Sequence, residues 1–108
     1  DNQIAYFWLK EEDFFRTGAT ASDTEGLIDH VRAIEPVVVA CVFEELEPEL
    51  TRISLRSKDK NVNVSDIAGQ FGGGGHQAAA GARIPGKPMG IQRRVVAAIR
   101  RALETRPS

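Results

Sequence analysis

Residues 37–57, VVVACVFEELEPELTRISLRS, carry the two clearest strand patterns of the chain. The continuous apolar run at 37–43 is typical of a strand that is buried on both faces. Residues 44–50, which include a proline, are predicted to form a connection. Polarity then alternates over 51–57, as in a strand with one buried face. Its apolar face would hold Ile53 and Leu55, and its polar face would hold Arg52, Ser54 and Arg56.

The segments on either side alternate between extended and helical patterns. Asn63 is expected to cap a helix that Gly72 ends in a left-handed conformation. The remaining expectations are strands at 4–9 and 82–84, helices at 25–33, 64–71 and 90–105, a helical turn at 10–15, a loop at 17–24 and a turn at 85–89. The sequence therefore predicts a single α/β domain over residues 1–108, with a mixed β-sheet flanked by helices.

The composition is that of an ordinary globular domain. The chain has 108 residues, of which 42% are hydrophobic and 27% charged, which excludes collagen-like, low-complexity and disordered chains. No apolar stretch approaches the roughly 20 residues that span a bilayer, and no signal-peptide pattern is present. The single cysteine, Cys41, is predicted to be a buried core residue rather than a nucleophile. A soluble, cytoplasmic protein with no membrane partner is expected.

The net charge of −1 hides two halves of opposite sign. Residues 1–50 carry twelve acidic and three basic side chains, whereas residues 51–108 carry eleven basic and three acidic ones. The second half is therefore where an anionic ligand is expected to bind, and the acidic half is expected to face away from it.

Residues 72–81 read GGGGHQAAAG, and packing alone does not explain four successive glycines. A glycine turn that enters a short helix would present backbone N–H groups to an anion, and His76 could donate to the same anion. The P-loop and dinucleotide-binding patterns do not fit this segment. The alternatives are a glycine loop with an incidental histidine and a solvated Arg56. His30 is predicted to be a surface residue.

GGGGHQAAAG is similar to the glycine-histidine signature of the DHH-associated domain, the C-terminal half of DHH-family phosphoesterases. The segments EGLIDHVRAIEPVVVACVFEE and ISLRSKDKNVNVSDIAGQF follow the order and spacing of that domain. The lead-in TGATASDTEGL most resembles the nano-RNase/oligoribonuclease and pAp-phosphatase branch, which is RecJ-like. The resemblance covers roughly residues 4–85.

The resemblance implies a substrate-binding role without catalysis in this chain. In the family, an N-terminal domain binds two manganese ions and cleaves the phosphodiester. The C-terminal domain holds the substrate. Here the corresponding substrate-binding residues would be Arg56 and Ser57 of SLRS, Gly73, Gly74 and Gly75, and His76.

The chain lacks an Asp-His-His triplet, and Asp29-His30-Val31 only imitates it. The sequence is therefore expected to be part of a longer enzyme, with no cofactor or metal of its own and with Mn2+ in a separate DHH domain. Expected partners are short RNA or DNA oligonucleotides, nucleotides such as pAp, and that DHH domain. The parent protein could form a homodimer.

Two other functions remain open on the sequence. The first is a tRNA-binding module like the C-terminal domain of alanyl-tRNA synthetase, which shares the glycine run. The second is the substrate domain of a cyclic dinucleotide phosphodiesterase, which shares the glycine-histidine signature. A folded domain with no ligand site is the remaining alternative.

Overall fold

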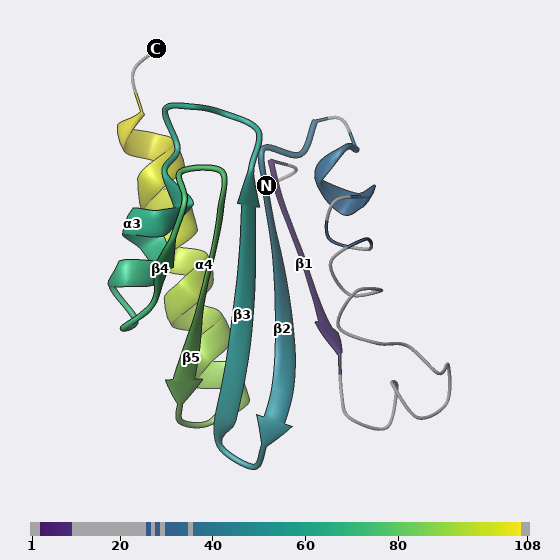
Figure 1. Ribbon diagram of the computed structural model, residues 1–108, viewed down its shortest axis with the longest axis vertical. Helices are drawn as coiled ribbons and strands as arrows, with labels where there is room; N and C mark the ends of the chain where they lie inside the picture. The colour runs from purple at the N-terminus through teal and green to yellow at the C-terminus, as the bar shows by residue number, and fades with distance from the viewer. Residues whose placement is uncertain (1–2, 10–25, 27, 29, 35, 107–108) are drawn as a thin grey trace.

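Five strands form one sheet in the order β1-β2-β3-β5-β4 (Figure 1). The computed structural model describes residues 3–9, 26, 28, 30–34 and 36–106. β1 runs parallel to β2, and all other neighbouring strands are antiparallel, so the predicted mixed sheet and α/β class are confirmed. The elements are β1 (Ile4–Leu9), β2 (Val39–Glu47), β3 (Leu50–Ser57), α3 (Val64–Gly69), β4 (Gly74–Gly75), β5 (Ala79–Pro85) and α4 (Pro88–Thr105).

Helices α3 and α4 cover one face of the sheet, which we call the inner face (Figure 1). β3 alternates between buried and half-buried residues, and Ile53 and Leu55 point into the core as predicted. The predicted stripe of α4 is buried against them, and its four members are Ile91, Val95, Ile99 and Leu103. Cys41 is also fully buried, as expected, and burial raises the pKa of its thiol far above the usual range.

The outer face of the sheet is divided between an apolar part and an open cationic part. Residues 26, 28 and 30–32 are helical, and Ile28 packs with Val37, Ala40 and Val42 in a second, smaller core. That core lies over β1 and β2, whereas β3, β5 and β4 leave their outer face uncovered by any described apolar cluster. This half of the sheet is therefore the one able to receive a ligand.

The predicted connection at 44–50 is wrong in its extent. β2 continues to Glu47, because Glu44 and Glu45 pair with Arg52 and Thr51 of β3. The register shifts between Glu45 and Glu47, and Glu49 has a φ of 61°, so only the Pro48-Glu49 turn joins the two strands. The polar composition concealed the end of a strand in which the Glu44 side chain pairs with Arg52.

The short helix expected after the glycines is also wrong. Gly74–Gly75 and Ala79–Pro85 form an antiparallel hairpin, and β5 pairs with β3 along its whole length. His76 and Ala79 exchange both backbone hydrogen bonds, of 2.8 and 3.2 Å, so the hairpin turns through Gln77 and Ala78. β5 thus includes and extends the predicted strand at 82–84, and α4 begins two residues earlier than predicted, at Pro88.

The predicted Asn63 cap and the left-handed Gly72 are confirmed, although α3 ends at Gly69, two residues before the predicted end of the 64–71 helix. The Asn63 carboxamide accepts from the N–H groups of Ser65 and Asp66, at 2.9 and 3.3 Å. At the other end the Gly73 N–H donates to the Ala68 carbonyl and the Gly72 N–H to the Gly69 carbonyl, which is the Schellman pattern. Gly72 has a φ of 84°, as its predicted position requires.

The remaining predictions are tested only in part. His30 is exposed, as predicted. The expected helical turn at 10–15 and the loop at 17–24 lie outside the described residues. None of the helices in the described ranges is long and apolar enough to cross a membrane.

Candidate substrate-binding site

A hollow of about 420 Å³ opens on the outer face of β3, β5 and β4. We call it the outer hollow. Its floor is made of the small residues Gly81 and Ala79 of β5, which lie opposite Ser54 and Arg56 of β3, respectively. Its lining includes Arg52, Ser54 and Arg56 of β3, Gly74 and Gly75 of β4, and Ala79, Gly81 and Arg83 of β5. Of the six predicted site residues, the structure thus places Arg56, Gly74 and Gly75 together.

Three arginines give the outer hollow its charge. Arg52 and Arg83 are directly opposite each other on β3 and β5, an arrangement that is unfavourable for two like charges alone. Glu44 of β2 relieves it, since its carboxylate pairs with the Arg52 guanidinium at 2.6 Å. Arg56 donates to the Leu55 carbonyl at 2.9 Å. In the part of the chain that the structure describes, these three arginines line the hollow and one carboxylate, Glu44, pairs with them, a surface suited to an anion.

The pairing of Glu44 with Arg52 corrects the expectation that the acidic half faces away. Glu44 is 3% exposed and lies on the same face of the sheet as the arginines. Among the described residues of the acidic half, Glu44 therefore lies on this face, and its carboxylate fixes the position of one guanidinium group.

The four glycines do different things. Gly72 takes the left-handed conformation in the turn after α3. A Cβ on Gly75, whose φ is 150°, would come within 2.6 Å of the Ala79 carbonyl oxygen. A Cβ on Gly73 would collide with the backbone of Gly81 and with Ala82. A Cβ on Gly74 would meet nothing within 4 Å, although Gly74 lines the outer hollow. Three glycines are thus required by the fold, and only Gly74 is left for a ligand to explain.

Ser57 and His76 lie outside the lining of the outer hollow. The Ser57 side chain is buried at the end of β3, where its hydroxyl donates to the Asp59 carbonyl at 3.0 Å and accepts from the Asp59 N–H at 3.2 Å. His76 is exposed at the end of β4, directly after Gly75 of the lining. Ser57 therefore shapes the turn after β3, and His76 is available to a ligand from the end of the hairpin.

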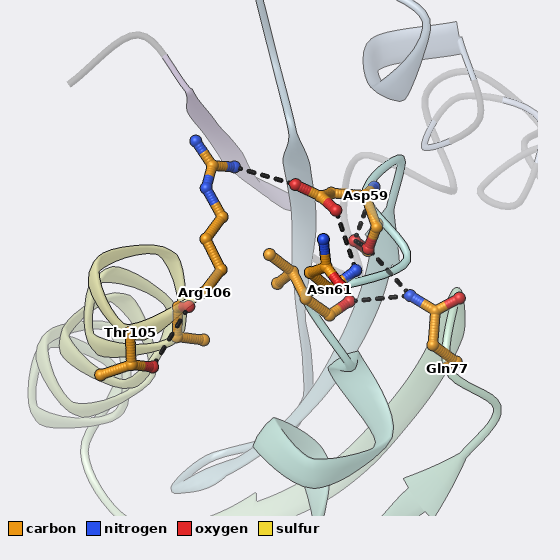
Figure 2. A network of polar contacts seen from close by, with 8 residues as sticks. Asp59, Asn61, Gln77, Thr105 and Arg106 are labelled. Carbon is orange, nitrogen blue, oxygen red and sulfur yellow. Dashed lines mark hydrogen bonds and ion pairs between the residues drawn. The ribbon is translucent and has the colours of Figure 1, made fainter. Parts of the chain in front are cut away.

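Gln77 holds the tip of the hairpin, and the sequence reasoning did not single it out (Figure 2). Its side-chain amide donates to the carbonyls of Asp59 and Val62, both at 2.9 Å. The main-chain carbonyl of Gln77 accepts a hydrogen bond from the Val64 N–H, at the start of α3, at 3.0 Å. The Asp59 carboxylate in turn pairs with Arg106 at 3.3 Å, just after α4 (Figure 2). The hairpin that carries the glycines and His76 is therefore tied to α3 and to the end of α4.

We expect Gln77→Leu to destabilise the domain by about 1–3 kcal/mol, because two partly buried carbonyls lose their donor while the side-chain volume is kept. Urea unfolding followed by circular dichroism measures this loss. Gln70→Leu is the matched control, since Gln70 is exposed and none of the described hydrogen bonds involves its side chain. Equal losses in both variants would contradict the role given to Gln77.

Within the described ranges, no three His, Cys, Asp or Glu side chains are placed to hold a metal ion together. The described site instead offers guanidinium groups, a hydroxyl and a backbone that is free of side chains at Gly74. These are donors for an anion and do not fit the pair of manganese ions that the resemblance implies for the family.

The family model of the DHHA1 domain matches residues 1–105, and the chain belongs to this family, the domain associated with DHH-family phosphoesterases. The match covers almost the whole chain, so it includes both the apolar and the cationic halves of the outer face. The expected DHH-associated domain is therefore confirmed.

Relatives and solved structures agree with this assignment. The chain is 41% identical over 58 residues to an uncharacterised protein of Methanocaldococcus jannaschii. This match covers 53% of this chain and 12% of that protein. An exopolyphosphatase-related protein from Bacteroides fragilis is similar with a TM-score of 0.76 and 25% identity, over 90% of this chain and 28% of that protein. The chain thus spans about an eighth and about a quarter, respectively, of these two proteins.

Two further structures share the fold at lower identity. A pGpG-specific phosphodiesterase from Vibrio cholerae has a TM-score of 0.55 and 18% identity, over 68% of this chain and 27% of that protein. The C-Ala domain of alanyl-tRNA synthetase from Aquifex aeolicus has a TM-score of 0.65 and 16% identity, over 90% of this chain and 87% of that domain. At these identities the likeness concerns the fold alone.

Proposed function

We propose that this chain is the substrate-binding domain of a cytoplasmic phosphoesterase and that its outer hollow binds the phosphate of a short oligonucleotide or of a nucleotide such as pAp. The observation that carries the proposal is the outer hollow itself, where three arginines from two adjacent strands surround a floor of glycine and alanine. A site that combines concentrated positive charge with an absence of bulky side chains suits a phosphate group that must approach the backbone closely.

Each part of the site has a role in this proposal. Arg56 provides a planar guanidinium that can bind two phosphate oxygens at once, and Arg83 adds charge from the neighbouring strand. Gly74 leaves room for the nucleotide, and His76 can donate to the phosphate or the sugar from the end of the hairpin. Cleavage would belong to a separate DHH domain of the parent protein, where the manganese ions would bind.

Arg56→Ala is expected to weaken the binding of pAp and of a 5′-phosphorylated RNA trimer by roughly 1.5–3 kcal/mol, the usual size for a hydrogen bond to a charged group. Isothermal titration calorimetry with the 108-residue chain measures the change. The matched control is Arg94→Ala on α4, an exposed arginine outside the outer hollow. An unchanged affinity in the Arg56 variant would remove Arg56 from the site.

The same titration separates the alternative functions. A preference for a cyclic dinucleotide over pAp and over linear dinucleotides would favour a cyclic dinucleotide phosphodiesterase. Binding of structured tRNA without preference for short 5′-phosphorylated oligomers would favour an RNA-binding module like the C-Ala domain. Failure of every phosphate ligand to bind would overturn the proposal.

A further inference from the structure

A second hollow, of about 280 Å³, lies between the exposed side of α4 and β1. We call it the α4 groove and define it by Tyr6 of β1 and by Met89, Gln92, Arg93, Val96 and Arg100 of α4. Tyr6 pairs with Cys41 on the inner face of the sheet, where α4 also packs. The α4 groove and the outer hollow are therefore on opposite sides of the sheet.

The Tyr6 ring is held in a fixed orientation although it is 43% exposed. Its hydroxyl accepts from the Gln92 side-chain amide at 3.2 Å, and the carbonyl of the same amide accepts from the Trp8 indole N–H at 2.6 Å. The ring also meets Phe43 edge to face, with centroids 5.9 Å apart. A partly exposed aromatic ring that is fixed from two sides is a ready platform on which a planar group can stack.

Arg93 and Arg100 line the same groove two helical turns apart, about 10 Å along the axis. Both are exposed, and neither has a recorded ion pair or hydrogen bond with the other described side chains. α4 carries four arginines and a single acidic residue, Glu104, which lies one turn after Arg100, so the helix is strongly cationic overall. This arrangement is favourable for a ligand with repeated negative charges.

We propose that the α4 groove binds single-stranded nucleic acid, with a base stacked on Tyr6 and backbone phosphates paired with Arg93 and Arg100. Single-stranded RNA alternates planar bases with phosphates, which matches an aromatic ring set beside two guanidinium groups. An acidic peptide would match the arginines but would make no use of a fixed aromatic ring. The site goes beyond the proposed function, because a ligand bound in the outer hollow does not reach the other side of the sheet.

The test is the binding of a fluorescent twelve-residue oligouridylate without a 5′-phosphate to the 108-residue chain, measured by anisotropy at several salt concentrations. The double variant Arg93→Gln/Arg100→Gln should weaken binding at least about tenfold and lower the salt slope by about 1.4, since each phosphate contact on a single strand contributes about 0.7. The matched control is Arg94→Gln/Arg101→Gln, which removes the same charge from the side of α4 that faces α3 and should have a much smaller effect.

Substitutions of Tyr6 test the stacking itself. Tyr6→Leu should weaken oligouridylate binding about thirtyfold, the middle of the range for one stacked base, whereas Tyr6→Phe should keep most of the affinity. Equal losses in the two arginine pairs, no loss in Tyr6→Leu, or polyglutamate binding as tightly as oligouridylate would each overturn the proposal. The affinity for pAp should be unchanged in all of these variants, so a failure here is distinguishable from a failure of the outer hollow.

Discussion

Replacing Gly75 with alanine is expected to open the β4–β5 hairpin and to destabilise the domain by roughly 2–6 kcal/mol, the sum of a left-handed backbone strain and an overpacked contact. The new Cβ would come within 2.6 Å of the Ala79 carbonyl oxygen and of the Ala80 Cα, which are both backbone atoms and cannot rotate away. The φ of 150° would strain an alanine even without that contact. Urea unfolding gives the size of the loss.

Gly74→Ala is the matched control for Gly75→Ala, with the same substitution one residue earlier. A Cβ there meets nothing within 4 Å, so the free energy of unfolding should change by less than about 1 kcal/mol, the range of glycine-to-alanine changes at unstrained sites. Because Gly74 lines the outer hollow, the added methyl group should still weaken pAp binding. A folded Gly74→Ala variant with undiminished pAp affinity would contradict the proposed site, and a fully stable Gly75→Ala variant would contradict the hairpin geometry.

The glycine run shows what the sequence could and could not predict. Four glycines indicated positive φ values or close backbone contacts, and the structure contains both, at Gly72 and at Gly73. The sequence does not show which glycine needs a positive φ and which needs a close contact. The atoms that a Cβ on Gly73 would contact belong to β5, eight or nine residues further along. The helix expected after the glycines failed for a similar reason. Alanines favour a helix locally, but pairing with β3 outweighs that propensity in the sheet.

The cationic face was predictable from β3 alone, but its composition was not. Alternation within 51–57 indicates that Arg52 and Arg56 share a face, and the structure confirms this. Arg83 joins them only through the pairing of β5 with β3, and Glu44 joins them only through β2. Neither neighbour leaves a local signal, so no pattern in the sequence indicates a carboxylate beside the arginines.

Ser57 and Gln77 illustrate the limits of reading residues from a signature. Ser57 follows Arg56 directly, and its role in substrate binding stays a prediction, whereas the structure shows its hydroxyl bonded to the backbone of Asp59. Gln77 follows His76 and carried no expectation, yet its amide connects the hairpin to the turn before α3. Both outcomes depend on the path of residues 58–62, which no periodic pattern describes.

The second large effect is expected at the centre of the core, where Phe43→Ala should destabilise the domain by about 3–5 kcal/mol. Phe43 of β2 is fully buried, and its ring stacks on Trp8 with centroids 4.7 Å apart. The same ring supports Tyr6 edge to face, so the substitution removes a wall of the α4 groove as well as core volume. A cavity at this position has little chance to collapse, because paired strands surround it on both sides.

Phe7→Ala is the matched control, because Phe7 lies on the neighbouring strand and packs only partly buried against the smaller core of the outer face. Its loss of stability should be clearly smaller, since a ring that is already partly in contact with water gives up less transfer free energy and leaves a smaller cavity. The comparison needs urea unfolding with unchanged m-values, which shows that the denatured states are equivalent. Oligouridylate affinity adds a second readout, because only Phe43→Ala should also weaken binding at Tyr6 under conditions where both variants are folded. Equal losses of stability in the two variants would mean that both faces of the sheet contribute equally to the free energy of unfolding. That result would contradict the division into a large inner core and a small outer one.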